Sequence, residues 1–98
     1  MKFVLKLYVT GQAPNSLRAM QNLKLLVKEF FEIEPDIKII DVLQDPQAAE
    51  DDKIIATPTL VKELPQPLRK MIGDLSNTEK VLIGLGLTHK KLGGSALQ

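Results

Sequence analysis

The side chains that most often carry catalysis or hold metals are sparse in this 98-residue sequence. It has no cysteine, which excludes disulfides, thiolate nucleophiles and cysteine-ligated metals. The single histidine, His89, stands beside two lysines and far in sequence from any pair of carboxylates, so a transition-metal site is not expected. The acidic run 50–52 lacks the alternating spacing of a calcium loop and should form a solvated helix surface. The composition therefore predicts neither a metal nor a cofactor.

The glycines and the overall charge exclude further classes of ligand. Gly84 and Gly86 fall inside a predicted helix, and the pair at 93–94 precedes no helix, so no glycine loop is expected to hold a phosphate. The net charge of +1 gives no global attraction to nucleic acid or to an anionic membrane. The apolar runs are too short to span a bilayer, and the first residues lack the features of a signal peptide. We therefore expect a cytoplasmic protein that binds neither nucleic acid nor membrane.

The first half of the chain predicts a strand, a helix and a second strand. Residues 2–9 alternate between apolar and other side chains, which is typical of a strand. After a short loop, Asn15 or Ser16 is expected to cap a helix, because either side chain can accept a hydrogen bond from a free amide of the first turn. Residues 37–43 are short and rich in β-branched side chains, which predicts a second, well-covered strand. The helix should run to about residue 31 and bury a stripe made of Met20, Leu23, Val27 and Phe30.

The middle of the chain predicts a short helix followed by a hairpin. Asp45 precedes Pro46, an arrangement typical of a capped helix with proline at its first position, and this helix should extend through about Lys53. Residues 59–64 and 68–72 have strand composition and are separated by a short segment with two prolines. They are expected to form two antiparallel strands.

The end of the chain predicts a last helix and a tail. Ser76 and Glu79 have the spacing of a capping box in front of an apolar run, so a helix is expected over about 77–87. Residues 88–98 have little to bury and are expected to form a flexible tail after a single domain of residues 1–87. The predicted order is β-α-β-α-β-β-α, with a parallel strand-helix-strand unit followed by antiparallel strands, which is an α/β fold of the thioredoxin arrangement.

Three stretches resemble thioredoxins at matching places in this order. QAPN (12–15) lies where thioredoxins carry their redox motif, TPT (57–59) where they carry a cis-proline, and GDLS (73–76) resembles their glycine turn before the last helix. Gln12 and Asn15 occupy the two redox positions, and an amide cannot form the thiolate that disulfide exchange needs. The resemblance therefore implies the fold without its usual chemistry, with structural roles for Pro58, Gly73 and Asp74.

A closer resemblance is to the KaiB family of circadian clock proteins, and it covers most of residues 1–87. It implies a non-enzymatic clock component that binds a hexameric KaiC-type ATPase, helps to sequester KaiA, and displaces a histidine kinase with a thioredoxin-like sensor domain. It further implies a homo-oligomer, dimeric or tetrameric, and a metamorphic fold whose C-terminal half has a second arrangement. The motifs that carry it are LKLYVTG (5–11), PNSLRA (14–19), KIIDVLQDPQ (38–47), DKIIATPTLVK (52–62), RKMIGDLS (69–76) and EKVLIGL (79–85).

Family motif positions also supply candidate contact residues for a partner or for a second copy. The same side chains could instead form an ordinary solvated face, and Tyr8 could serve core packing. Asp41 lies within an apolar strand and is expected at its end, paired or hydrated, because an uncompensated buried carboxylate is costly. The candidates are Lys6, Tyr8, Arg18, Lys38, Lys53, Lys62 and Arg69.

Two departures from clock-type members leave the cellular role open. Those members carry an acid in the stretch that here contains Gly86, and an acidic tail where this chain has THKKLGGSALQ. A role beside a KaiC homologue in stress or metabolic regulation is therefore a second possibility. A thioredoxin-like sensor or adaptor without a clock role is a third, and an enzyme using Ser16 or Tyr8 with glutathione is a fourth.

Overall fold

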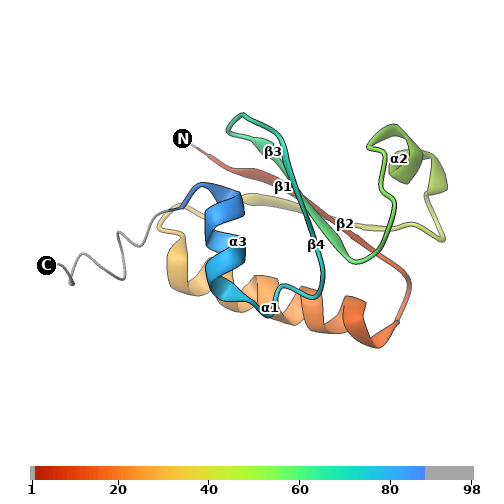
Figure 1. Cartoon of the computed structure of the whole chain (residues 1–98), viewed down its shortest axis with the longest axis horizontal. Helices are drawn as coiled ribbons and strands as arrows, with labels where there is room; N and C mark the ends of the chain where they lie inside the picture. The colour runs from red at the N-terminus through yellow and green to blue at the C-terminus, as the bar shows by residue number, and fades with distance from the viewer. Residues whose placement is uncertain (1, 88–98) are drawn as a thin grey trace, which may run out of the picture.

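The computed structural model describes residues 2–87 of the chain. The predicted tail at 88–98, with His89, lies outside the described residues. Four strands and three helices follow one another in the predicted order, which confirms the α/β thioredoxin-like arrangement (Figure 1). The second arrangement implied by the family resemblance stays a prediction. The elements are β1 (Val4–Val9), α1 (Pro14–Phe30), β2 (Asp36–Asp41), α2 (Pro46–Asp51), β3 (Thr59–Leu64), β4 (Arg69–Ile72) and α3 (Thr78–Leu85).

The four strands form one mixed sheet in the order β2-β1-β3-β4. β1 runs parallel to β2, as expected for strands joined by a crossover helix, and antiparallel to β3, which pairs with β4 as a hairpin. Figure 1 shows α1 and α3 together beside the sheet, with α2 standing apart from them. β1 is therefore a central strand, with a neighbour along each edge.

The alternation of β1 divides the interior into two clusters on opposite faces of the sheet. One face carries the main core, in which Leu5, Leu7 and Val9 pack against α1 and α3. The other face, here called the α2 face, carries a small cluster of Tyr8, Ile40 and Val61. Partly buried side chains pack around this small cluster: Val42, Ala48, Ala49 and Ile54.

Strand β2 is not the well-covered strand that its composition predicts. It ends at Asp41, and only Ile40 among its residues is buried. Ile37 and Ile39 face the side of α1 but remain 38% and 46% exposed. The reason is topological: β2 is an edge strand, so the helices that cover the central strands reach it only in part. The prediction of the strand was right, whereas the prediction of its cover was wrong.

Helix α1 starts earlier than expected and without a side-chain cap. It begins at Pro14, whose ring presets the backbone angle of a first helical residue, and Ala13 stands at the cap position. Ser16, expected as a cap, is buried, and its Oγ accepts a hydrogen bond from the Thr10 N–H at 3.0 Å. Asn15, the other expected cap, accepts instead from Arg18. The predicted apolar stripe does pack against the main core, with Leu23 buried and Met20, Val27 and Phe30 partly buried. The buried residues of α1 are Ser16, Ala19, Leu23 and Leu26.

Helix α3 is capped by residues other than those predicted. Asn77, rather than Ser76, is the N-cap, and its side chain accepts from the Lys80 N–H at 3.1 Å. Gly86 lies at the C-cap with a φ of 77°, so it ends the helix and does not sit inside it. This left-handed conformation is costly for residues with a Cβ and easy for glycine. The early stop corrects the predicted end of the helix.

Replacing Gly86 with alanine should destabilise the protein by about 1 kcal/mol, because alanine must adopt the left-handed conformation at this cap. The measurement is the free energy of unfolding from urea titrations followed by circular dichroism. The matched control is Ile83→Ala on the exposed side of the same helix, which should change the stability by less than about 0.5 kcal/mol. Equal stability of Gly86→Ala and the unmodified protein would contradict the assigned cap.

Candidate binding surface

The corner that carries the redox motif in thioredoxins is occupied here by unreactive groups. Gln12 and Asn15 are exposed, and the Thr57-Pro58 peptide is cis, as the resemblance to thioredoxins implies. The hydroxyls of Thr10 and Thr57 hydrogen-bond to each other. Ser16, proposed above as a substitute nucleophile, is fully buried beneath them and already engaged. No described side chain at this corner is both free and nucleophilic.

The loop between β4 and α3 is braced by the residues predicted to be structural. Gly73 has a φ of 126° and donates its N–H to the Pro58 carbonyl at 3.0 Å. Asp74 accepts from the Ser76 N–H at 3.0 Å. Hydrogen bonding from the Ser76 side chain, followed by this backbone bond, lowers the pKa of the Asp74 carboxyl below the ordinary value. The Asp74 carboxylate also pairs with Arg18 of α1 at 3.4 Å. The loop is thus fixed from its own backbone and from α1.

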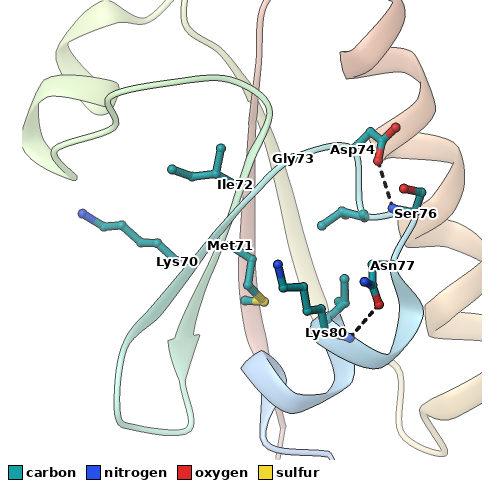
Figure 2. A pocket seen from close by; sticks show the side chains of 10 residues that line it. Lys70, Met71, Ile72, Gly73, Asp74, Ser76, Asn77 and Lys80 are labelled. Atoms are coloured by element: carbon teal, nitrogen blue, oxygen red, sulfur yellow. Dashed lines mark hydrogen bonds between the residues drawn. The ribbon is translucent and has the colours of Figure 1, made fainter.

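A cavity of about 430 Å³ lies between β4 and the start of α3 (Figure 2). Lys70 and Lys80 lie on its walls, Asn77 lies at the start of α3, and Asp74 lies in the loop before it. Both Asp74 and Asn77 already serve the loop and the helix cap. The mixed charge of the walls selects no particular ligand.

Polar side chains form a compact group on the α2 face, here called the Asp52 cluster: Lys6, Tyr8, Asp52 and Glu63. Lys6 Nζ lies 2.8 Å from a Glu63 carboxylate oxygen and 3.2 Å from an Asp52 oxygen. The Tyr8 hydroxyl donates to Asp52 at 2.5 Å and lies 3.2 Å from the Ala48 carbonyl oxygen. The cluster therefore joins β1 and β3 to the end of α2.

Hydrogen bonding and burial set the protonation of the Asp52 cluster. The contact with Glu63 raises the pKa of the Lys6 ammonium, against the opposing effect of its burial. Burial, followed by the bond to Asp52, raises the pKa of the Tyr8 phenol to about 12. The hydrogen bond from Tyr8 lowers the pKa of the Asp52 carboxyl. At neutral pH the cluster holds an ammonium, a neutral phenol and a negative Asp52 carboxylate.

The structure separates the predicted contact residues into inward and outward groups. Tyr8 is fully buried, and Lys6 is engaged in the Asp52 cluster. Lys62 is only 4% exposed. Its Nζ lies close to Gly86 at the C-terminal end of α3, 4.0 Å from where a Cβ of residue 86 would stand. A cation is favourable there because the last helix carbonyls carry partial negative charge. The outward group is Arg18, Lys38, Lys53 and Arg69.

Strand register places several lysines in one line across the α2 face. Lys38 pairs with Lys6, Lys6 pairs with Val61, and Val61 pairs with Lys70. Paired residues point to the same side of a sheet, so Lys38, Lys6 and Lys70 form a row here called the basic row. Lys53 lies next to it, because Lys70 Nζ donates to the Lys53 carbonyl at 3.4 Å. Sequence reasoning missed Lys70, Asp52 and Glu63, since only the register and the path of α2 bring them to this face.

Asp41 stands at the end of β2, as predicted. Its Oδ1 accepts from the Gly11 N–H at 3.1 Å and from the Leu43 N–H at 3.0 Å. The carboxylate is therefore satisfied by backbone donors and joins the loops that follow β1 and β2.

Neither a metal site nor a membrane span is found in the part of the chain that the structure describes. No three acidic or histidine side chains among residues 2–87 lie close enough together to hold a metal ion. No described helix is both long enough and apolar enough to cross a bilayer.

The fold and the amide-bearing corner define a thioredoxin-like domain without the thiols of redox exchange. Solved structures agree on the fold: the N-terminal domain of Synechococcus elongatus SasA matches with a TM-score of 0.71 at 23% identity, covering 98% of this chain and 88% of that one. Mitochondrial thioredoxin 3 of Saccharomyces cerevisiae matches with a TM-score of 0.70 at 19% identity, covering 87% and 77%.

Sequence comparison identifies the family within this class. The KaiB domain model matches residues 6–87. The circadian clock oscillator protein KaiB of Microcystis aeruginosa is 58% identical over 90 residues, which cover 92% of this chain and 86% of that protein. The KaiB protein of Thermosynechococcus vestitus is 55% identical over 94 residues, covering 96% and 87%. The chain belongs to the KaiB family of circadian clock proteins.

The Tyr8 phenol should lose its proton near pH 12, above the ordinary value of 10.0, because it is buried and bonded to Asp52. A pKa raised by folding stabilises the fold fully below pH 10, and this contribution, at most about 3 kcal/mol, is lost as the pH rises through 12. Phenolate absorbance measures the ionisation directly, since Tyr8 is the only tyrosine and the chain has no tryptophan.

The control is Tyr8→Phe, whose unfolding free energy should lack this alkaline decline. A phenolate midpoint near pH 10 in the still-folded protein would show that Tyr8 is not held in the Asp52 cluster.

Proposed function

We propose that this protein is a non-enzymatic regulatory module that binds a hexameric KaiC-type ATPase and so modulates circadian timing. The observation that carries the proposal is the 58% identity with a circadian clock oscillator protein over 92% of this chain. The amides at Gln12 and Asn15 support a role without redox turnover, because the fold keeps its shape there but has no thiol to react. ATP hydrolysis would belong to the partner.

The exposed cations are the proposed contacts with that partner. Lys38 and Lys70 of the basic row, together with Lys53, offer a local positive surface although the whole chain has a net charge of only +1. Local charge of this kind steers association and fixes orientation more than it adds raw affinity. Arg18 and Arg69 lie on other parts of the surface and are candidates for a second copy of the chain or for another clock component.

Further partners follow from the same family assignment. We propose KaiA and a histidine kinase with a thioredoxin-like sensor domain as further members of the same regulatory system, together with a homo-oligomeric state of this chain in the cytoplasm. The mainly exposed edge strand β2, with Ile37 and Ile39, gives apolar surface that an assembly could cover.

Co-elution with a KaiC-type hexamer in the presence of a non-hydrolysable ATP analogue is the direct test. The expected result is a stable complex, and Lys38→Glu should weaken it about tenfold by reversing one charge of the basic row. Titration by fluorescence anisotropy of the labelled chain gives the affinity.

The matched control is Lys24→Glu on the exposed side of α1, which changes the net charge equally and should leave the affinity within about twofold. Binding to a sensor kinase but not to any KaiC-type ATPase would replace the proposal by an adaptor role. Equal loss in both variants would contradict the assignment of the contact surface to the basic row.

A further inference from the structure

Helix α2 is the single helix over the α2 face among the described elements, and its apolar attachment is slight (Figure 1). It has six residues, none of them buried. Its packing onto Tyr8, Ile40 and Val61 comes from partly buried alanines and from Ile54 just beyond its end. Isolated helices this short are unstable in water, so tertiary contacts must hold α2 in place.

The polar contacts that hold α2 converge on its C-terminal end. Tyr8 lies within hydrogen-bond distance of the Ala48 carbonyl and of Asp52, and Lys6 pairs with Asp52. Lys70 of β4 donates to the Lys53 carbonyl. Cations are favourable there because the C-terminal end of a helix carries partial negative charge. Two strands, β1 and β4, therefore fasten the same end of the helix.

The N-terminal end of α2 is fixed differently. Asp45 caps the helix through the Ala48 N–H at 3.1 Å, and its own N–H bonds to the Asp41 carbonyl at 2.9 Å. These contacts lie within the chain segment that leads out of β2, so they can persist if the helix swings away from the sheet. At the other side, Ile55 is 86% exposed in a segment without regular structure. The connection to β3 can therefore follow a movement of α2.

We infer that residues 46–56 form a flap whose attachment to the sheet depends on the negative charge of Asp52. With that charge present, the carboxylate binds Lys6 and Tyr8 together and closes the flap over the α2 face. When the charge is removed, Lys6 keeps Glu63 as its partner, Tyr8 loses its anionic acceptor, and the flap opens while the sheet, α1 and α3 stay folded.

The charges around Asp52 determine the direction of the response. Lys6 and Tyr8 face it from β1, Lys70 from β4, and Glu63 from β3 through Lys6. The bond from Tyr8 lowers the pKa of Asp52, so attachment is complete above the ordinary carboxyl value and is lost as the pH falls through the lowered one. At neutral pH the flap is closed.

Hydrogen exchange of the chain at neutral pH tests the flap. The amides of Lys53 and Ile54 bond to carbonyls of α2, so they report its helical state. In Asp52→Asn these amides should exchange at least tenfold faster than in the unmodified protein. The exchange rates of the α1 amides should differ by less than twofold between the two proteins. Acrylamide should also quench the fluorescence of Tyr8, the only tyrosine in a chain without tryptophan, at least twofold more strongly.

The matched control is Asp51→Asn, which removes the same charge from the adjacent position, where the carboxylate accepts from Gln47 of the same helix at 2.9 Å. It should exchange like the unmodified protein. Unchanged exchange of Lys53 and Ile54 in Asp52→Asn, or an equal increase across α1 and β1, would overturn the inference. If Asp52→Asn does not fold, Tyr8→Phe removes the hydroxyl but keeps the ring, and the same amides are compared.

Discussion

Strand β1 has to satisfy two different environments at once, and the rest of the structure depends on this constraint. Strands β2 and β3 form hydrogen bonds with its two edges. Its side chains therefore lie on the two covered faces of the sheet and must find partners there. Leu5, Leu7 and Val9 enter the main core, whereas Lys6 and Tyr8 enter the face covered by α2. An ammonium and a phenol so placed require partners, because a polar group removed from water without a hydrogen bond is costly.

The two faces consequently differ in what holds them. On the main-core face, α1 and α3 bury a continuous apolar cluster, and the attraction is non-directional. On the α2 face, a small apolar cluster is completed by the directed contacts of the Asp52 cluster. Apolar packing on the first face therefore stabilises the domain. On the second face, the position of α2 depends on charged groups.

The same division bears on the family to which the chain belongs. The thioredoxin-like fold here keeps the loop at Gly73 and Asp74 fixed by hydrogen bonds, and the hydroxyls of Thr10 and Thr57 bond to each other at the corner where thioredoxins carry thiols. Surface that remains available for recognition lies elsewhere, at the basic row and along the edge of β2. This distribution is consistent with the proposed role as a binding module.

Local patterns in the sequence predicted the elements well, because short-range effects decide them. The alternation in β1, the proline at the start of α2 and the two prolines of the hairpin each act within a few residues. Caps were predicted less well: Pro14 starts α1 without a polar cap, and Asn77 takes the place of Ser76 at α3. Neighbouring residues compete for such positions, and tertiary contacts, such as the bond from Thr10 to Ser16, decide among them.

The sequence by itself determined the order of elements, the absence of thiol chemistry and the resemblance to the KaiB family, since all three depend on residue types and their local spacing. Only the tertiary structure decided that β2 lies at an edge, that Lys62 and Tyr8 turn inward, and that Asp52 meets Lys6 across 46 positions of the chain. Strand order and register bring such distant residues together, and they arise from packing of the whole chain rather than from any single segment.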